Sequence, residues 1–262
     1  MKDTSDYALN QENWYASSQG SFTLMREKSL LQRALSPWPR RGHSLLDVQC
    51  GTGIFLDFFW EGGFDVSGID SHQVFVSLAA ERLNGKADVQ VGVPDYLPFP
   101  DNEFDYVTLL HVLERAQSAP PILAEALRVA AKGVVIAFLN PWSVAAWGDR
   151  IACCLRRKTR AAPWAAHKHI SPLEYYRMVR ACPCKASISL RSTLFGPQWT
   201  WSQRFSVVNT LTLPLPFGTL GIVRIDLAPL HVGTPLPLRL QNVSFKNLTP
   251  VRIMERSRKD PS

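Results

Sequence analysis

Short apolar runs alternate with segments of helical periodicity along the first 140 residues of the chain. The runs that predict strands are Ser44–Val48, Phe64–Ile69, Ala87–Val91, Phe104–Leu110 and Gly133–Leu139. Helical spacing of apolar residues predicts helices between them, at Ile54–Trp60, Gln73–Leu83 and Pro120–Ala131. Because helical crossovers connect parallel strands, the pattern predicts a doubly wound α/β sheet with helices on both faces.

Residues 1–42 precede this alternation and predict a helical approach segment. Leu24, Leu30 and Leu31 recur at helical spacing, and prolines and a glycine follow between residues 37 and 42. We therefore assign residues 1–42 to a separate N-terminal helical segment.

The second half of the chain is less regular. Pro141–Lys158 has one apolar helical face and a basic end, and Ser171-Pro172-Leu173-Glu174 has the composition of a helix start with a capping box. Ser187–Leu194 and Leu220–Leu227 predict two more strands, giving a seven-stranded Rossmann-like sheet of mostly parallel order. We place the main domain at residues 43–227, with an insertion at 141–200, and a partly flexible C-terminal extension at 228–262.

Composition excludes several classes of protein without identifying one. The chain has 262 residues, of which 46% are hydrophobic and 19% charged, so it is neither disordered, collagenous nor a disulfide-stapled miniprotein. The net charge is +7, and ten of the 29 Lys and Arg lie between residues 150 and 191, where Glu174 is the one acidic residue. The excess charge therefore attracts an acidic substrate or an anionic membrane, or it is a solvated face. Without interleaved aromatic residues or a reading motif, nucleic acid is a poor candidate.

The cellular compartment is predicted from two further features. The N-terminus lacks the basic start and apolar run of a secretory signal, so we expect a cytoplasmic protein with its five cysteines reduced. Phe205–Val223 is free of charge, but its prolines and glycines predict a loop that leads into a strand instead of a membrane span.

Candidate chemistry begins at the first strand, which ends in Asp47-Val48-Gln49-Cys50-Gly51-Thr52-Gly53. Glycines after a strand allow a tight turn close to a ligand, and the helix that follows presents free N–H groups. Asp70 ends the next strand, where a carboxylate can accept both hydroxyls of a ribose. The acidic residue before the glycines and the absence of a third glycine argue against a dinucleotide. A smaller, cationic aminoacyl-sulfonium nucleoside suits the loop better.

Five sequence blocks strengthen this interpretation by their order. They are Trp14-Tyr15 with Gly20-Ser21-Phe22, the glycine loop, Val66–Asp70, Leu97–Asp105 and Leu110-His111-Val112-Leu113-Glu114. Together they resemble the class I S-adenosylmethionine-dependent methyltransferases, in particular the type 11 small-molecule group. The resemblance covers about residues 14 to 140 well and extends weakly to about residue 227.

The resemblance implies an activity, a cofactor and a set of site residues. It implies methyl transfer from S-adenosylmethionine, with Asp47, Gly51 and Gly53 around the methionine portion and Asp70 on the ribose. It places His111 near the methionyl or methyl end. Tyr15 and Phe22 would belong to a lid. The expected cofactor contacts are Tyr15, Asp47, Gln49, Cys50, Gly51, Gly53, Asp70, Ser71, Asp95 and His111.

Two departures from the family pattern bear on cofactor affinity. The family usually has Gly or Ala where Gln49 stands, so this side chain crowds the cofactor's amino acid end or hydrogen-bonds it. Val93 and Pro94 occupy the positions that usually recognise adenine, and proline has no N–H to donate. Adenine selectivity then comes from Asp95, a water or apolar stacking; otherwise affinity is low. The alternative to an enzyme is thus a degenerate, nonenzymatic cofactor-binding or interaction module.

Other candidate sites keep alternative interpretations. His111 is a candidate general base, a cofactor contact or a structural histidine. Cys153-Cys154, His167, His169, Cys182 and Cys184 resemble a zinc ligand set, but their spacing fits poorly, and we predict no metal. Pro141–Lys158 either caps the active-site cleft or lies on an anionic membrane. Trp164, His167, His169 and Tyr175 are candidate walls of a pocket for a small-molecule or lipid-like acceptor. Oligomeric state is not encoded in any of these patterns.

Overall fold

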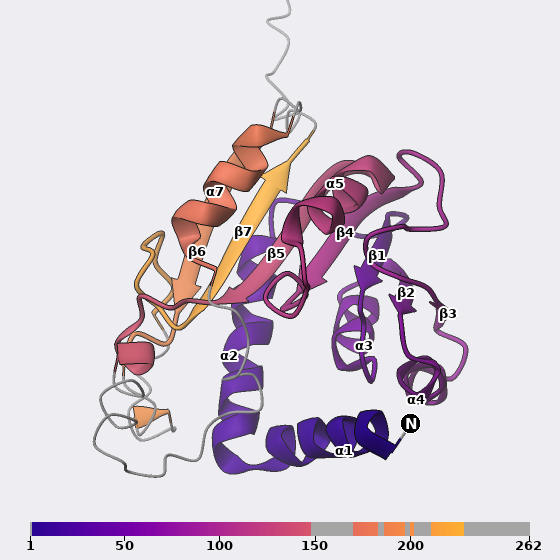
Figure 1. Cartoon of the computed structure of the whole chain (residues 1–262), viewed down its shortest axis with the longest axis horizontal. Helices are drawn as coiled ribbons and strands as arrows, with labels where there is room; N and C mark the ends of the chain where they lie inside the picture. The colour runs from indigo at the N-terminus through magenta and orange to yellow at the C-terminus, as the bar shows by residue number, and fades with distance from the viewer. Residues whose placement is uncertain (1, 148–169, 183–185, 197–199, 202–210, 228–262) are drawn as a thin grey trace, which may run out of the picture. The chain divides into compact units, whose positions relative to one another are not determined.

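The computed structural model describes residues 2–147, 170–182, 186–196, 200–201 and 211–227. Within them lies a seven-stranded sheet in the order β3-β2-β1-β4-β5-β7-β6 (Figure 1). The strands are β1 Ser44–Val48, β2 Asp65–Asp70, β3 Ala87–Val91, β4 Phe104–Leu110, β5 Ala130–Leu139, β6 Ser187–Thr193 and β7 Leu220–Asp226. β1 to β5 pair in parallel, and β7 runs antiparallel to β5 and β6. The predicted doubly wound, mostly parallel, seven-stranded sheet is confirmed.

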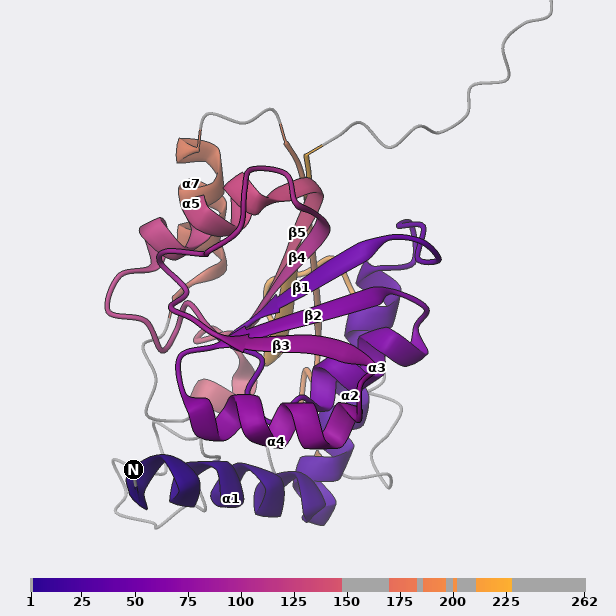
Figure 2. The ribbon, with the colours of Figure 1, turned by 90° about the vertical axis from the view of Figure 1, so that its right-hand side faces the viewer.

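Helices cover both faces of this sheet (Figure 2). They are α1 Lys2–Ala16, α2 Ser18–Ala34, α3 Ile54–Glu61, α4 Gln73–Leu83, α5 Ala119–Val129 and α7 Pro172–Ala181. Apolar residues of α2, α3 and α4 share one buried cluster with the sheet, and those of α5 and α7 share the other. Two apolar layers therefore bury the parallel strands on both sides, which explains their near-continuous hydrophobic runs.

Most element boundaries agree with the sequence pattern. Ser44–Val48, Gln73–Leu83, Ala87–Val91 and Phe104–Leu110 begin and end where the pattern places them. The helix predicted to reach Ala131 is shorter, because Ala130 already pairs with Phe104 as the first residue of β5. Alanine suits either structure, so pairing with the neighbouring strand decided this boundary.

The N-terminal segment consists of two helices that meet at a sharp junction. Ser17 has an extended backbone and its hydroxyl accepts the N–H of Gly20, which starts α2. A Cβ on Gly20 would lie 1.9 Å from the carbonyl oxygen of Trp14, so glycine lets the two helices approach this closely. α1 then lies alongside α4, as Figure 2 shows.

Helix α7 confirms one expectation and overturns another. The Ser171 hydroxyl accepts the N–H of Glu174, whose carboxylate accepts the N–H of Ser171, so the predicted capping box is present. Tyr175, proposed as an acceptor-pocket wall, is fully buried with its ring 4.5 Å from that of Phe138. It faces the sheet because α7 packs on β5 and β7, so it is a core residue.

Several expectations fall outside the described residues. They concern most of the helix Pro141–Lys158, the residues Trp164, His167 and His169, and the extension 228–262. Residues 211–219 lead as a loop into β7, as predicted for that part of Phe205–Val223. Among the described helices, none combines the length and apolarity needed to cross a bilayer.

Candidate functional site

Three chemistry-bearing residues meet at the carboxyl edge of the parallel sheet. Asp47 lies next to the end of β1, Asp70 ends β2, and His111 directly follows β4. β1 has β2 on one side and β4 on the other, so the order of connections reverses here. Ligands of open α/β sheets bind at such a point, because the loops diverge and leave a crevice.

The loop after β1 turns through three residues with left-handed backbones. The φ angles are +58° at Gln49, +57° at Gly51 and +79° at Gly53. A Cβ on Gly53 would lie 3.0 Å from the Cβ of Ala79, so the loop presses against α4 and needs glycine there. Gln49 adopts an angle that a non-glycine residue rarely takes, and its amide bonds the Ser71 hydroxyl at 3.1 Å.

Asp70 holds this loop in place. One carboxylate oxygen accepts the N–H of Gly51 at 3.0 Å, and the other accepts the N–H of His72 at 2.9 Å. The side chain is almost completely buried. Each oxygen keeps a further lone pair, so the carboxylate can still accept a ligand hydroxyl.

Two adjoining cavities flank the loop. The smaller, of about 50 Å³, is lined by Gln11, Tyr15, Asp47, Gln49, Cys50, Gly51, Phe55, Phe75, Leu110, His111 and Arg115. The larger, of about 460 Å³, is lined by Gln49, Ser71, His72, Val93, Pro94, Asp95, Val112, Arg115, Ala116, Gln117, Ser118, Pro121 and Ile122. Gln49 and Arg115 line both. The fold thus brings the ten expected cofactor residues to one region, with Gly53 and Asp70 supporting the walls.

Asp47 gives the smaller cavity its electrostatic character. Burial raises the pKa of Asp47 to about 7, and the negative charges of Asp70 and Glu27 add to this effect. The hydroxyl of Thr108 donates to the carboxylate at 2.6 Å and opposes the rise. Ionised Asp47 is therefore costly until a positive charge comes near it, so the cavity favours a cationic ligand.

His111 is held between two carboxylates. Its Nε2 lies 2.8 Å from Glu27 and its Nδ1 lies 3.3 Å from Glu114. Burial lowers the pKa of His111, but the two carboxylates outweigh this and raise the pKa to about 10. As an imidazolium that donates both N–H groups, His111 has no lone pair with which to accept a proton.

The N-terminal helices cover the smaller cavity. Gln11 and Tyr15 of α1 form part of its wall. Glu12 fastens α1, because its carboxylate accepts the Thr52 hydroxyl at 2.5 Å and pairs with Arg82 at 2.6 Å. Phe22, expected in the lid, packs instead in the core beneath α2. Tyr15, named with Phe22 for the lid, is buried and lines the smaller cavity.

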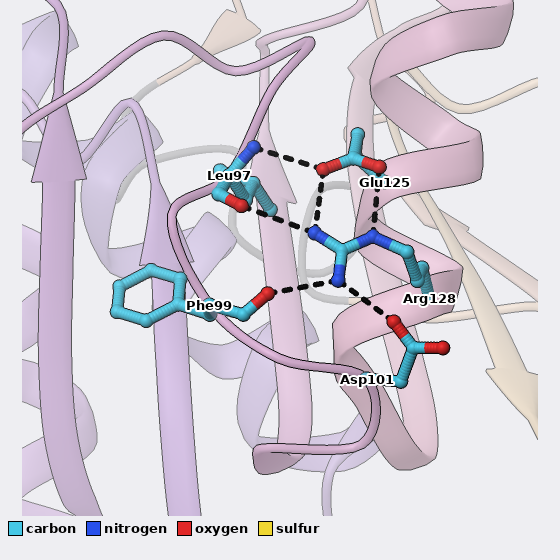
Figure 3. Close-up of polar contacts among 5 residues, drawn as sticks. All are labelled: Leu97, Phe99, Asp101, Glu125 and Arg128. Atoms are coloured by element: carbon cyan, nitrogen blue, oxygen red, sulfur yellow. Dashed lines mark hydrogen bonds and ion pairs between the residues drawn. The ribbon is translucent and has the colours of Figure 1, made fainter.

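Arg128 of α5 fixes the loop beside the larger cavity (Figure 3). Its guanidinium donates to the carbonyls of Leu97 and Phe99 at 3.0 and 2.8 Å and pairs with Asp101 and Glu125. Glu125 also accepts the N–H of Leu97 at 2.9 Å. The loop that directly follows the lining residues 93–95 is thereby held to α5.

Of the zinc ligand set considered from the sequence, Cys182 is the one member within the described residues, and Cys153, Cys154, His167, His169 and Cys184 lie outside them. No group of three or more His, Cys, Asp or Glu in this part of the chain is arranged to hold a metal. Cys50 is a buried free thiol, and burial raises the pKa of Cys50 far above its usual range. The Cys50 thiol is thus unreactive, and Cys50 contributes to the wall of the smaller cavity by its shape.

Sequence reasoning missed several residues of this region. They are Gln11, Glu27, Phe55, Phe75, Arg115, Glu125 and Arg128. Arg115 directly follows the block that ends at Glu114 and could have been included on that basis. Phe55 comes two residues after Gly53 and could have been included for the same reason. The others reach the site by packing of distant segments, which no local pattern encodes.

Comparisons with known proteins agree with this architecture. Residues 46–138 match a family model described as a methyltransferase domain. The demethylmenaquinone methyltransferase of Bacillus licheniformis is 33% identical over 99 residues, 36% of this chain and 42% of that protein. A ubiquinone biosynthesis O-methyltransferase of Paramagnetospirillum magneticum is 30% identical over 165 residues, 59% of this chain and 62% of that protein.

Solved structures extend the likeness of the fold. The magnesium protoporphyrin IX methyltransferase of Synechocystis, solved with bound S-adenosylhomocysteine, has a TM-score of 0.61 at 13% identity. The match covers 84% of this chain and 93% of that one. At this identity the similarity establishes the shared fold.

Proposed function

We propose that this chain, whose residues 46–138 belong to the methyltransferase-domain family, transfers a methyl group from S-adenosylmethionine to a small-molecule acceptor. The observation that carries the proposal is Asp47: a buried carboxylate with a pKa raised to about 7, at the wall of the crevice where the sheet order reverses. Such a group suits a ligand that brings its own positive charge into the crevice.

The residues present fit this cofactor. Asp47 would accept from the ammonium of its methionine portion, beside the loop that includes Gly51. Asp70 would accept from the ribose hydroxyls with the lone pairs that the backbone N–H groups leave free. Val93 and Ile122 offer apolar walls for adenine, and Asp95 lies exposed at the rim of the same cavity.

The chain contributes to the reaction by alignment, exclusion of water and charge. When bound, S-adenosylmethionine supplies a methyl group on a positively charged sulfur. An O, N or C nucleophile of the acceptor can attack the methyl carbon in line with this bond, and the sulfur leaves as a neutral thioether. Gln11 and Tyr15 of α1 close the methionine side from water. The ammonium and the ribose hydroxyls are common to S-adenosylmethionine and S-adenosylhomocysteine, so Asp47 and Asp70 would hold both forms of the cofactor in the same place. The described residues show no free base at His111, so we propose alignment as the main catalytic contribution.

The acceptor that we favour is a quinone-like or lipid-like molecule at an anionic membrane surface. The relatives named above include two quinone-pathway enzymes. Trp142, Val144 and Trp147 follow β5 with side chains between 44% and 58% exposed. Residues 150–191, which carry ten Lys and Arg against the single acidic residue Glu174, come next in the chain. Exposed Trp next to basic residues suits the interface of the anionic cytoplasmic leaflet, which would also make the protein cytoplasmic.

Vesicle cosedimentation tests the membrane contact. We expect binding to vesicles with anionic lipid, little binding to zwitterionic vesicles, and loss of binding when Arg156, Arg157 and Lys158 become Glu. Binding that survives this change would show that the basic end of the segment is not responsible. The other acceptor that suits a basic rim is a small anionic metabolite. In that case we expect no vesicle binding, and phosphate-bearing compounds should compete with the acceptor for its site.

Calorimetric titration tests the cofactor. We expect saturable binding of S-adenosylmethionine and S-adenosylhomocysteine and no thermal protection by NAD. No binding at millimolar cofactor would overturn the proposal. A nonenzymatic cofactor-binding module is the second candidate, because Gln49 occupies a left-handed backbone position and Pro94 donates no N–H. It predicts cofactor binding without methyl transfer to any of a panel of demethylated quinones.

A further inference from the structure

The side chain of His111 connects three parts of the fold that are distant in sequence. The residue follows β4 directly, and its Nε2 meets the carboxylate of Glu27 on α2, 84 residues earlier in the chain. Its Nδ1 meets Glu114, whose other oxygen accepts the N–H of Leu139 at the end of β5. His111 thus joins β4, β5 and α2 at the wall of the smaller cavity.

Burial makes this contact consequential. The side chains of Glu27 and Glu114 are 4% and 1% exposed, and that of His111 is 18% exposed. Two carboxylates withdrawn from water require compensating donors, and an imidazolium supplies one N–H to each. If His111 loses its proton, one buried carboxylate loses its hydrogen-bond donor and both lose the positive charge.

The backbone conformation fixes where the imidazole can lie. His111 has a φ of +56°, and its N–H donates to the carbonyl of Ala137 at 3.0 Å. A left-handed backbone outside glycine is uncommon and persists where the surroundings determine it. Here the pairing with β5 and the two carboxylates hold the residue at the edge of the cavity.

Other charged groups face the same region from neighbouring elements. Asp47 of β1 and Arg115 line the cavity together with His111. Asp70 at the end of β2 acts on Asp47, as does Glu27. Tyr175 of α7 lies near Glu114, whose charge adds to burial in raising the tyrosine pKa. Arg115 and the acidic groups therefore also affect the His111 titration, but Glu27 and Glu114 are its direct hydrogen-bond partners.

We propose that Glu27 is a positioning residue of the cofactor site: through its buried ion pair with His111 it fastens α2 to the carboxyl end of β4. The close junction at Ser17 and Gly20 connects α1 to α2, and α1 carries Gln11 and Tyr15 into the cavity wall. Fastening α2 therefore holds the cover closed. His111 acts as a structural cation in this arrangement. The time for which the cofactor stays bound then depends on the contact between Glu27 and His111, and this part of the inference rests on the proposed function.

The first experiment follows the His111 ring by NMR titration and α2 by amide hydrogen exchange, without cofactor. In the unchanged protein we expect both ring nitrogens to stay protonated through neutral pH and the ring to lose one proton near pH 10. Protection of the α2 amides, relative to their intrinsic exchange rate at each pH, should fall as that proton leaves. Glu27→Gln keeps the side-chain shape, and we expect it to lower the His111 midpoint by about 1–3 pH units and to accelerate exchange in α2. The matched control is Glu81→Gln, an exposed position on α4, which should change neither quantity.

The second experiment measures the dissociation rate of S-adenosylhomocysteine. We expect Glu27→Gln to raise that rate about tenfold, while Glu81→Gln leaves it unchanged. A His111 midpoint near 6.5 in the unchanged protein overturns the ion pair, and this measurement needs no variant to fold. A shifted midpoint in Glu27→Gln with unaltered exchange in α2 overturns the fastening role. If the unchanged protein binds no cofactor while the NMR and exchange results hold, the proposed function fails and the ion pair stands.

Discussion

Asp47 and Asp105 lie on paired neighbouring strands, yet their electrostatic surroundings are opposite. Asp105 is near the start of β4, where it accepts from Lys132 at 2.6 Å, from His43 at 2.9 Å and from the N–H of Ser44 at 3.0 Å. Partial burial works to raise the Asp105 pKa, but these donors outweigh it and the pKa is lowered. Asp47 is near the end of β1, where burial dominates and raises its pKa to about 7.

The difference separates a charge that the protein satisfies from one that it leaves for a ligand. At the amino edge of the sheet, Lys132 neutralises Asp105, and His43 and the N–H of Ser44 donate hydrogen bonds to it, so the network is structural. At the carboxyl edge, acidic groups surround Asp47 and raise the cost of its ionisation. A carboxylate in a crevice whose ionised form is disfavoured marks a functional position, whereas a carboxylate that is paired with nearby donors does not.

The largest effect is expected for Asp70→Asn, which removes a charge from the carboxyl edge. One of the two backbone N–H groups, of Gly51 or His72, would then face an amide N–H₂ in place of an acceptor. We expect the Kd for S-adenosylhomocysteine to rise about 100-fold by calorimetry, since an unsatisfied buried donor costs about 1–3 kcal/mol and a ligand contact is lost as well. Asp65→Asn, at the exposed start of β2, is the matched control. A change below threefold in Asp70→Asn would contradict the assigned role.

Asp47→Asn should weaken cofactor binding and at the same time stabilise the folded protein. The amide keeps an acceptor for Thr108, and we expect the cofactor Kd to rise about tenfold because the charge is lost. Since the folded pKa of Asp47 exceeds the unfolded value of 3.8, its contribution to stability is full below pH 3.8 and is lost as pH rises through 7. Urea unfolding should therefore show Asp47→Asn more stable by about 2 kcal/mol at pH 8, with little difference near pH 4. Equal stability at both pH values would argue against an unfavourable charge at Asp47.

Arg128→Lys should have an intermediate effect, on the loop beside the larger cavity. Lysine cannot reproduce the planar fork that meets Leu97, Phe99 and Glu125 (Figure 3). We expect a loss of about 1 kcal/mol in unfolding free energy, faster hydrogen exchange at residues 97–101 and a cofactor Kd raised about threefold. Arg33→Lys, at an exposed position in the last turn of α2, should change none of these. Unchanged exchange at residues 97–101 in Arg128→Lys would show that the loop is held by other contacts.

The smallest effect is expected for Asp105→Asn, the counterpart of Asp47→Asn. Because the folded pKa of Asp105 lies below 3.8, its stabilising contribution is present above that value and is lost as pH falls through the folded pKa. Thermal or urea unfolding should show Asp105→Asn less stable by about 1 kcal/mol at pH 7 and equal to the unchanged protein at the lowest pH. Cofactor binding should be unaffected. A raised Kd for the cofactor would show that the two edges of the sheet are coupled.

Local sequence determined much of this protein. The apolar runs, the glycines at 51 and 53 and the Ser171 capping box fixed the strands, the turn and a helix start, because each depends on residues a few positions apart. Asp70 was recognisable for the same reason, since the end of a parallel strand in this fold is already a ligand-facing position.

Contacts between distant segments decided the rest. No local pattern distinguishes Tyr175 in the core from a pocket wall, or Phe22 in the core from a lid residue, because burial depends on which face packs on the sheet. Asp47 and Asp105 are alike in sequence, each an acidic residue in an apolar strand, and only their three-dimensional neighbours give them opposite pKa shifts. Charge interactions act through space, so the pairing of Glu27 with His111 across 84 residues is fixed by the tertiary structure and by nothing nearer in the chain.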